Sequence, residues 1–584
     1  MKKMSALLIL ASAFLLSGCV SDQSDNFAHV HRRIAKQEAE NLETFNVTTD
    51  LNAEKQIHTA AQKTYLEYDG NYKDIPTDQY PDGLSHISDP EPVNLAWEFS
   101  VPAGKTLSRY SVKVGKKADL SDGYVINGTT ASSLDIYNSY LGDNYFQIIA
   151  NYSDNTTDSS VIKKYTVENV YPRNLKIDGM TNCRDMGGGR TLEDGGTIKQ
   201  GLIFRTSGTN SWGNGKAVVP DNITNDGKAE LLQRLGCKTE INVNNSGSNQ
   251  VGVQNFVDAY MWYDGGKHHL FRNSEPIKKV FHALSDENNY PVFYHCRIGT
   301  DRTGLCAILI SGLLGVSENE IYQDYLFSNF GNIQEKRFIG EAAGRDNILN
   351  YINDLKAFPG EKFQNKIYNY LLSIGVPASE LNSVINILTE GNKAQGNDNA
   401  QQVVLADDFS ADGTEKQTST SAAHPASYYT LTADSYVTAS FSPSYSGEAT
   451  VVAYLGSTND SSTKKVNEAI TVSVGGTEMA ISDDLTFYEA GFGQGSSRTY
   501  YAGVQLGTVQ VKKGNLDIDV FGVADDLNIG AISLIPNQKV TPSGGNDGAA
   551  KKGCFGSITA ASTLIGLVAF AGVGVLVFRK KKEQ

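Results

Sequence analysis

The chain has 584 residues and a formal net charge of −14 at pH 7. Because one hydrophobic core rarely serves more than about 250–300 residues, we expect several domains. The hydrophobic fraction of 40% and the charged fraction of 20% are typical of folded globular proteins. An acidic chain argues against nucleic acid as the main partner, but it leaves room for a small basic pocket around one phosphate.

The first segment is predicted to direct export. The charged start Met1–Lys3 precedes an apolar run, Ala6–Leu16, which is too short to span a bilayer comfortably. The sequence Leu16-Ser17-Gly18-Cys19 follows and resembles the bacterial lipobox, in which the cysteine becomes a diacylated N-terminus. We predict a signal peptide over residues 1–18 and lipidation at Cys19; an ordinary signal peptide with an incidental cysteine is the alternative.

A polar stretch and a β-rich segment come next. Residues 19–89 are polar, with helical stretches such as Ala35–Thr44, and are predicted to form a tether. Residues 90–170 contain short alternating segments separated by turn residues, namely Val93–Phe99, Tyr110–Val114 and Asn144–Ile148. This rhythm resembles an immunoglobulin-like or fibronectin-type (FN3) β-sandwich, in which Trp97 would be a core residue.

Residues 171–395 alternate between predicted strands and helices. The expected strands are Lys238–Val243 and Val292–Tyr294, and the expected helices include Leu231–Leu235, Pro276–Leu284, Thr303–Leu314, Ser317–Phe327 and Lys362–Leu372. Alternation of this kind predicts an α/β domain in which helices cover a sheet.

Residues 403–537 are predicted to be all-β again. The expected strands are Ala449–Tyr454, Ile470–Val474, Leu516–Val520 and Leu527–Leu534. The pattern resembles the jelly-roll sandwich of carbohydrate-binding modules, which implies surface glycans as partners. Exposed aromatic side chains could stack on sugar rings, although each could equally pack within the domain; the candidates are Tyr428, Tyr429, Tyr500 and Tyr501.

The C-terminal end is predicted to cross the membrane. A linker over residues 538–553 leads to an uncharged stretch, Gly556–Phe578, whose length suits a transmembrane helix. Positive residues open the tail at 579–584, and because such residues stay inside, the bulk of the chain is expected on the extracellular face of the cell membrane. A sorting signal removed after export is the alternative.

One segment between a strand and a helix has the composition of a phosphate-binding loop. Cys296 follows the buried strand, and Arg302 follows after five residues. Backbone N–H groups at a helix N-terminus and an arginine fork can neutralise a phosphate, and the same positive field makes a cysteine nucleophilic. The residues predicted to bind the phosphate are Arg297, Ile298, Gly299, Thr300 and Thr303, with His295 supporting the thiolate indirectly.

This chemistry requires no metal and no other cofactor, because Arg302 and the loop amides carry the positive charge. The six cysteines include no CxxC pair, which makes a zinc site of that kind improbable. A buried structural cysteine and a rhodanese-type sulfur carrier are the competing interpretations of the loop. The rhodanese loop to its arginine is one residue shorter, so the five-residue spacing favours a phosphatase.

The sequence from His295 to Gly304 resembles the His-Cys-x-x-Gly-Lys-Asp-Arg-Thr-Gly signature of the bacterial tyrosine/lipid phosphatase family. The segments Asn182–Gly188, Gly201–Ser207, Val316–Asn329 and Ile374–Leu388 resemble other parts of that family in the same order. The resemblance implies a cysteine phosphatase of dual-specificity type. The family's loop lysine is Thr300 here, which weakens a phosphoinositide substrate, and Asn242-Val243-Asn244 replaces an Asp-Leu-Arg segment.

Two aspartates compete for the role of general acid. The resemblance implies Asp301, which could instead cap the following helix. Asp264 lies 32 residues before Cys296, about where many tyrosine phosphatases carry a mobile acid loop, and it could instead be a solvated turn residue. Asp185 is predicted to support the segment beside the loop.

The leading hypothesis is a cell-surface phosphomonoester hydrolase acting through a phosphocysteine on phosphotyrosine protein or a small phosphate monoester. One alternative is an inositol-phosphate or phosphoinositide phosphatase. An alternative of another class is a surface glycan- or protein-binding protein with a vestigial phosphatase domain. The intact set of Cys296, Arg302 and Thr303 argues against a vestigial site.

Overall fold

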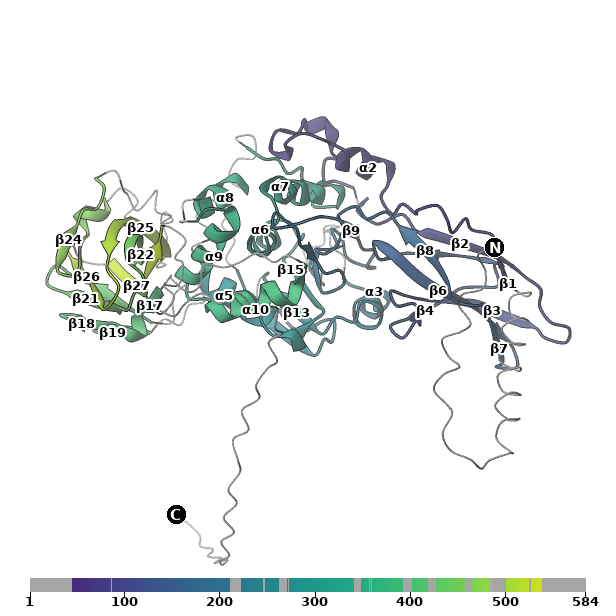
Figure 1. The fold of residues 1–584 in the computed structure, drawn as a ribbon. Helices are drawn as coiled ribbons and strands as arrows, with labels where there is room; N and C mark the ends of the chain where they lie inside the picture. The colour runs from purple at the N-terminus through teal and green to yellow at the C-terminus, as the bar shows by residue number, and fades with distance from the viewer. Residues whose placement is uncertain are drawn as a thin grey trace, which may run out of the picture. The chain divides into compact units, whose positions relative to one another are not determined.

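The computed structural model describes residues 45–537 except 86, 211–221, 245–246, 262–269, 271–272, 341–347, 357, 359, 392–401, 419–426, 458–464, 484, 486–499 and 525–526. Three structural regions follow one another along the chain, as the sequence predicts (Figure 1). Cys19, Asp264 and the segment Gly556–Phe578 lie outside the described residues. Within the described part of the chain, every helix is too short or too polar to traverse a bilayer.

The N-terminal region is a sandwich of two antiparallel sheets. One sheet has the order β1-β2-β5, and the other has the order β4-β3-β6-β7 with β8 also paired to β6. The strands are β1 (Phe45–Val47), β2 (Val93–Phe99), β3 (Leu107–Gly115), β4 (Tyr124–Asn127), β5 (Ser133–Ile136), β6 (Gly142–Tyr152), β7 (Thr157–Ser159) and β8 (Lys163–Val167). Trp97 is buried in the core against the edge of Tyr110, which confirms its predicted place.

The predicted tether over residues 19–89 is wrong for its described part. Strand β1 pairs with β2 and completes a sheet of the sandwich. Helix α2 (Ala60–Leu66) begins at a capping box formed by Thr59 and Gln62. The ring of Tyr65 is fully buried against Phe327 and other aromatic rings of the central domain. Burial of such large apolar surfaces holds this segment on the domain instead of leaving it in water.

The central domain is built on a six-stranded sheet with the order β14-β13-β15-β12-β10-β9. Strands β14, β13, β15 and β12 run parallel, and β10 and β9 are antiparallel to their neighbours. The bounds are β9 (Arg173–Asn174), β10 (Arg184–Asp185), β12 (Ile203–Thr206), β13 (Thr239–Asn242), β14 (Asn255–Asp258) and β15 (Val292–His295). A separate pair is formed by β11 (Thr197–Ile198) and β16 (Thr389–Glu390).

Helices lie on both faces of this sheet (Figure 1). Phe204 and Phe293 point toward α3 (Asn225–Ala229) and the π-helix Glu230–Arg234 that continues it. Ile203, Val292 and Tyr294 point the other way, toward the larger core. Helices that contribute to that core include α5 (Ser274–Leu284), α6 (Arg302–Leu313), α7 (Glu318–Phe327), α8 (Ile348–Lys356), α9 (Phe363–Ser373) and α10 (Ala378–Leu388). Alternate residues of parallel strands face opposite layers, so both faces of the strands are apolar.

The C-terminal region is a second two-sheet sandwich. One sheet contains β17 (Gln402–Leu405), β19 (Lys416–Thr418), β20 (Ser427–Leu431), β22 (Gly447–Ser457), β25 (Tyr500–Val511) and β27 (Leu527–Pro536). The other contains β18 (Ser410–Asp412), β21 (Tyr436–Phe441), β23 (Ile470–Val474), β24 (Thr477–Met479) and β26 (Leu516–Gly522). Tyr429 is buried and stacks on Phe409, so of the two alternatives for this residue the structure shows packing within the domain.

Candidate active site

Cys296 lies where the central strand β15 ends, and α6 begins at Arg302. The chain must turn sharply between them, and Gly299 provides the turn with a φ of +74°. A Cβ at Gly299 would meet the carbonyl oxygen of Thr206 at 2.7 Å, so only glycine fits. The loop therefore enters a helix N-terminus at the carboxyl edge of a parallel sheet, where anions are commonly bound.

Neighbouring segments hold the carbonyl groups of this loop. The N–H of Gly208 donates to the Arg297 oxygen at 3.0 Å. The Asn182 amide donates to the oxygens of Ile298 and Gly299, both at 3.2 Å. None of the hydrogen bonds between described residues uses the N–H of residues 297–300 as donor. With the carbonyls engaged on one side, these N–H groups remain to receive an anion.

Cys296 is buried, and its charge state depends on opposing effects. Burial raises the pKa of the thiol, and the nearby carboxylate of Asp301 raises it further. The nearby Arg302 guanidinium and Thr303 lower the pKa and outweigh both, so the net pKa lies below that of an ordinary cysteine. Such a cysteine is more readily ionised, and the thiolate is the nucleophilic form.

Arg302 is oriented by a residue that the sequence did not identify as functional. Its Nη2 donates to the Asn244 side-chain oxygen at 2.7 Å, and its Nη1 donates to the Met261 carbonyl at 3.4 Å. Asn244 belongs to the segment that departs from the family's Asp-Leu-Arg pattern. An amide in this position holds the arginine fork by a hydrogen bond without adding charge.

His295 is held by a second residue that the sequence analysis missed. Its Nε2 lies 2.9 Å from Oε1 of Glu240, and both side chains are buried. Glu240 comes from β13, which pairs with β15 in parallel register. His295 thereby supports the loop from the sheet, and its ring makes its second contact with the Cys296 carbonyl at 3.2 Å.

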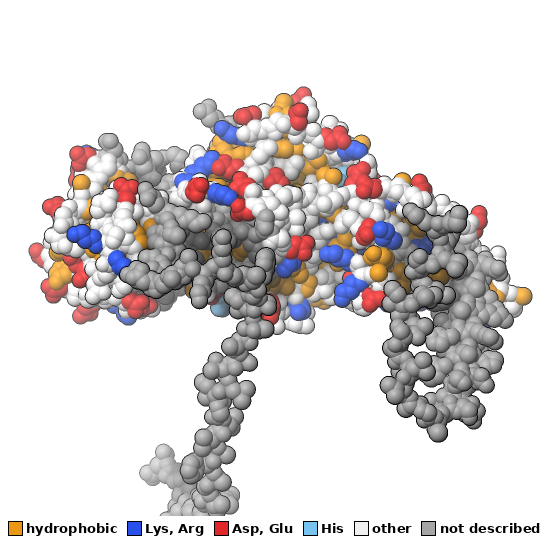
Figure 2. Space-filling model, viewed as in Figure 1, with side chains coloured by type: hydrophobic (Ala, Val, Ile, Leu, Met, Phe, Trp, Pro, Cys, Tyr) orange, Lys and Arg blue, Asp and Glu red, His pale blue; other side chains and the backbone are white. Residues whose placement is uncertain are grey.

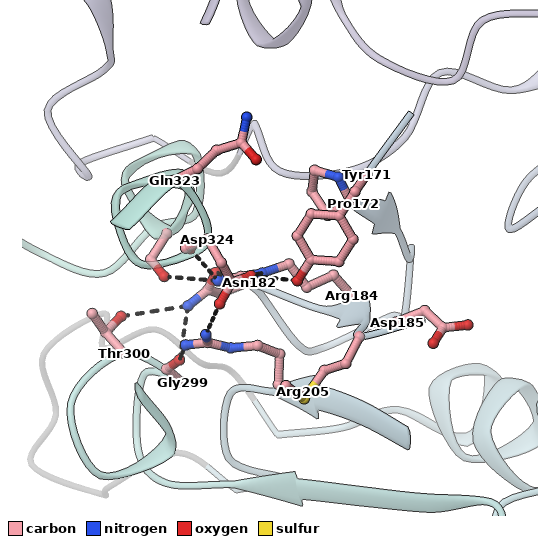
Figure 3. Close-up of polar contacts among 12 residues, drawn as sticks. Tyr171, Pro172, Asn182, Arg184, Asp185, Arg205, Gly299, Thr300, Gln323 and Asp324 are labelled. Atoms are coloured by element: carbon pink, nitrogen blue, oxygen red, sulfur yellow. Dashed lines mark hydrogen bonds and ion pairs between the residues drawn. The ribbon is translucent and has the colours of Figure 1, made fainter. Parts of the chain in front are cut away.

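A buried cluster of charges lies behind the loop (Figure 3). The Asp324 carboxylate from α7 accepts a hydrogen bond from Arg184 Nε at 2.7 Å and forms an ion pair with Arg205. Tyr171 also donates its hydroxyl to Asp324 at 2.7 Å. Burial raises the pKa of Asp324, but the two arginines outweigh burial and hold the pKa far below its usual range.

This cluster is connected directly to the loop. Arg205 Nη2 donates to the Gly299 oxygen at 2.8 Å. Arg184 contacts the side-chain oxygen of Asn182, whose amide nitrogen holds the loop. The positions of two loop carbonyls therefore depend on arginines that are themselves fixed by Asp324.

The other predicted residues occupy distinct places. Asp185 pairs with Arg173 at 2.8 Å and accepts the N–H groups of Gly187 and Gly201. It supports its own segment and makes none of its described hydrogen bonds to the loop. Thr300 is fully buried, with its hydroxyl 3.4 Å from the Asn182 amide nitrogen.

Of the two candidate general acids, the structure describes Asp301 and does not describe Asp264. The Asp301 side chain makes no capping hydrogen bond to α6; its carboxylate pairs with Arg337 at 3.0 Å. The alternative role as a helix cap is thus not what the structure shows. Asp264 lies outside the described residues, so it stays a prediction from the sequence.

Known proteins share parts of this chain. The model described as the tyrosine phosphatase family matches residues 237–371, which contain the loop and α6. A Cupriavidus necator protein whose name assigns it to the tyrosine-protein phosphatases is 25% identical over 189 residues. The match covers 27% of this chain, which spans 64% of that relative's length.

Solved structures are also similar in part. The core catalytic domain of the PP-IP phosphatase SIW14 from S. cerevisiae has 16% identity and a TM-score of 0.19, covering 28% of this chain and 82% of that chain. A family 35 carbohydrate binding module from Clostridium thermocellum has 14% identity and a TM-score of 0.18, covering 24% of this chain and 98% of that chain.

The site thus combines a cysteine after a parallel strand, an arginine six positions later and N–H groups at a helix start, an arrangement suited to binding a phosphate group beside a nucleophile. The central domain is similar to the tyrosine phosphatase family over the matched residues 237–371.

We predict that Asp324→Asn destabilises the protein by about 3–5 kcal/mol, the usual cost of breaking a buried ion pair. The change leaves Arg184 and Arg205 without a carboxylate while keeping the size of the side chain. Chemical unfolding of the two proteins measures the difference. Asp143→Asn is the matched control, because its pair with Lys164 is exposed and worth at most about 1 kcal/mol. Equal losses in the two variants would contradict the prediction.

Proposed function

We propose that the protein hydrolyses phosphate monoesters through a phosphocysteine. The observation that carries the proposal is the loop between β15 and α6, which places Cys296 and Arg302 at the two ends of one tight turn, and the lowered pKa of the Cys296 thiol supports it. In the first step the thiolate sulfur attacks phosphorus, the ester P–O bond breaks, and the leaving oxygen takes a proton. In the second step water attacks phosphorus, the P–S bond breaks, and phosphate and the thiolate are released.

We propose phosphotyrosine in a protein, or another small phosphate monoester, as the substrate. Arg302 and the loop amides match the charge of one phosphate group. The family's loop lysine is replaced by Thr300, whose buried hydroxyl lies near Asn182 and adds no charge. A substrate with several phosphates, such as an inositol phosphate or a phosphoinositide, would find less positive charge here and is the alternative.

Cys296→Ser is expected to abolish hydrolysis of an aryl phosphate, since a serine hydroxyl at this site is a far weaker nucleophile. The measurement is phosphate release by the purified ectodomain from a phosphotyrosine peptide, a phosphoinositide and an inositol phosphate. EDTA should leave the rate unchanged, because Arg302 and the loop amides neutralise the charge.

Cys183→Ser is the matched control. Cys183 is equally buried and donates to the Thr181 carbonyl at 3.2 Å, a bond that a serine hydroxyl can keep. Turnover by Cys296→Ser at the wild-type rate would refute the phosphocysteine. Faster release from the inositol phosphate would refute the substrate proposal and favour its alternative.

We also propose that the protein acts at the extracellular face of a bacterial membrane. The proposal rests on the lipobox-like residues before Cys19 and on the uncharged stretch Gly556–Phe578 followed by cations. Cells that express the full chain should incorporate labelled palmitate, and Cys19→Ala should remove the label. Protease added to intact cells should cleave the protein. Label that persists in Cys19→Ala would contradict lipidation at this residue.

A second candidate function, glycan binding, is favoured by the C-terminal sandwich. Tyr436 of β21 and Phe521 of β26 are direct partners in the register, with ring centroids 5.2 Å apart. Phe521 is 37% exposed, while Val437 and Val520 beside them point into the core. The rings therefore lie together on the outer face of the sheet, where the C–H face of a sugar ring could stack.

Polar side chains follow the two aromatic rings on the same face. Thr438 donates to Asp519 and Ser440 donates to Asp517, both at 2.7 Å. Figure 2 shows Asp and Glu side chains scattered over the surface formed by β21, β24 and β26. Carboxylates accept hydrogen bonds from sugar hydroxyls and repel anionic chains, so we propose a neutral glycan as the ligand.

Phe521→Ala should weaken binding of the ectodomain to neutral oligosaccharides on a glycan array by about tenfold. The reason is that stacking of a ligand ring on an aromatic side chain contributes about 1–3 kcal/mol, as measured for nucleic-acid bases. Val125→Ala, an equally exposed apolar position at 41% on the other sandwich, is the control and should bind as wild type. Wild-type protein that binds no glycan would remove the proposal. Glycan binding with an inactive wild-type loop would favour the vestigial-phosphatase hypothesis.

A further inference from the structure

Asp301, the residue before α6, forms an ion pair that shields it from water. Its Oδ2 lies 3.0 Å from Nη2 of Arg337, and only 14% of the Asp301 side chain and 7% of the Arg337 side chain are exposed. Arg337 also pairs with Glu335 through its other terminal nitrogen. The pair joins the start of the catalytic helix to a segment 36 residues further along the chain.

The charges around the pair keep Arg337 positive. Burial lowers its pKa, but Asp301, Tyr325 and Glu335 raise the pKa and outweigh burial, so the net pKa lies above its ordinary value. A fixed cation at hydrogen-bonding distance favours the ionised form of a carboxyl group. The Asp301 carboxylate therefore pairs with Arg337, and its negative charge raises the pKa of the Cys296 thiol.

The backbone of Arg337 is held firmly. Asn329 accepts the Arg337 N–H at 2.7 Å and donates to its carbonyl at 3.1 Å. The N–H groups of Ile333 and Gln334 both donate to the Gly83 carbonyl at 2.9 Å. A buried guanidinium anchored on both sides of its own residue has little freedom to leave Asp301.

The anchor on Gly83 belongs to the segment that the sequence predicts as a tether. Lys336 donates to the Tyr80 carbonyl at 2.9 Å and also contacts the Thr77 carbonyl. The Lys336 ammonium lies 4.6 Å from the centre of the Tyr80 ring. Residues 77–83 thus hold the segment from which Arg337 reaches the catalytic loop.

We propose that Arg337 is a positioning residue that keeps Asp301 ionised, so that Asp301 serves as the base of the second step. This inference rests on the proposed phosphocysteine. Water attacks phosphorus, its proton passes to the Asp301 carboxylate, the P–S bond breaks, and Cys296 leaves as thiolate. The leaving oxygen of the first step takes its proton from water, or departs unprotonated when it is a phenolate.

The test separates the two steps in the ectodomain with aryl phosphates of graded leaving-group pKa. Rapid mixing measures the burst of phenol from the first step, and steady-state turnover measures the second. Asp301→Asn should keep the burst and slow turnover by about 100-fold or more, the usual size of a general-base contribution. Arg337→Gln should keep the burst and slow turnover by about tenfold on the acid side of the pH profile, the effect of raising the pKa of the base by one unit.

A double-mutant cycle shows whether Arg337 acts through Asp301. In the Asp301→Asn background, Arg337→Gln should cause no further loss of turnover. Arg337→Lys, which keeps the positive charge, should recover most of the activity. In Arg337→Gln the acid limb of the turnover profile should move to higher pH, because Asp301 then gains its proton more easily.

Three results would overturn the inference. The first is a burst lost in Asp301→Asn with a steeper dependence on leaving-group pKa, which would make Asp301 the acid. The second is an equal loss from Arg337→Gln in both backgrounds, which would make Arg337 structural. The third is an acid limb of the turnover profile that lies at the same pH in Arg337→Gln as in the wild type. A wild-type protein that shows neither burst nor turnover would instead refute the proposed phosphatase function.

Discussion

The shape of the catalytic loop depends on one buried carboxylate, Asp324. Removing an aspartate and two arginines from water is costly unless each charge is paired, so the geometry of Arg184, Arg205 and Asp324 has little freedom. Arg205 then holds the Gly299 carbonyl. Arg184 contacts Asn182, whose amide donates to the carbonyls of Ile298 and Gly299. Because these carbonyl groups are hydrogen-bonded to the network, the N–H groups of the loop face the site where a phosphate would bind. The loop is therefore shaped by a network that takes no part in the chemistry.

The same arrangement divides positive charge between structure and catalysis. Arg184 and Arg205 are neutralised behind the loop, whereas Arg302 lowers the pKa of Cys296 in front of it. Asn244 and Met261 hold Arg302 through uncharged oxygens, so neither of these two contacts neutralises its charge. The Asp301 carboxylate raises the pKa of the Cys296 thiol and so acts against Arg302. The same carboxylate forms an ion pair with Arg337.

The segment before the first sandwich joins this network from outside the matched family region. Tyr65 packs on aromatic residues at the end of α7 and in the turn that follows, and residues 77–83 hold the backbone beside Arg337. Ser88 accepts a hydrogen bond from the N–H of Asn182 at 3.3 Å, and the Asn182 side chain in turn holds the loop. A polar composition suggested a tether because its few aromatic residues are spread along the sequence. Their burial became apparent only where α7 and the following turn supply a complementary apolar surface.

The sequence by itself determined the chemistry of the loop and most of its secondary structure. Strand β15, Cys296, Gly299, Arg302 and α6 are contiguous, so local spacing is enough to recognise them. Only the tertiary structure decided which residues hold the loop. Glu240, Asn244 and Arg337 lie 55, 58 and 36 residues from their partners, and Asp324 lies 140 and 119 residues from its two arginines. Pairing over such separations follows from strand order and helix packing, which no local pattern encodes, and the ion pair that places Asp301 is likewise a product of the fold.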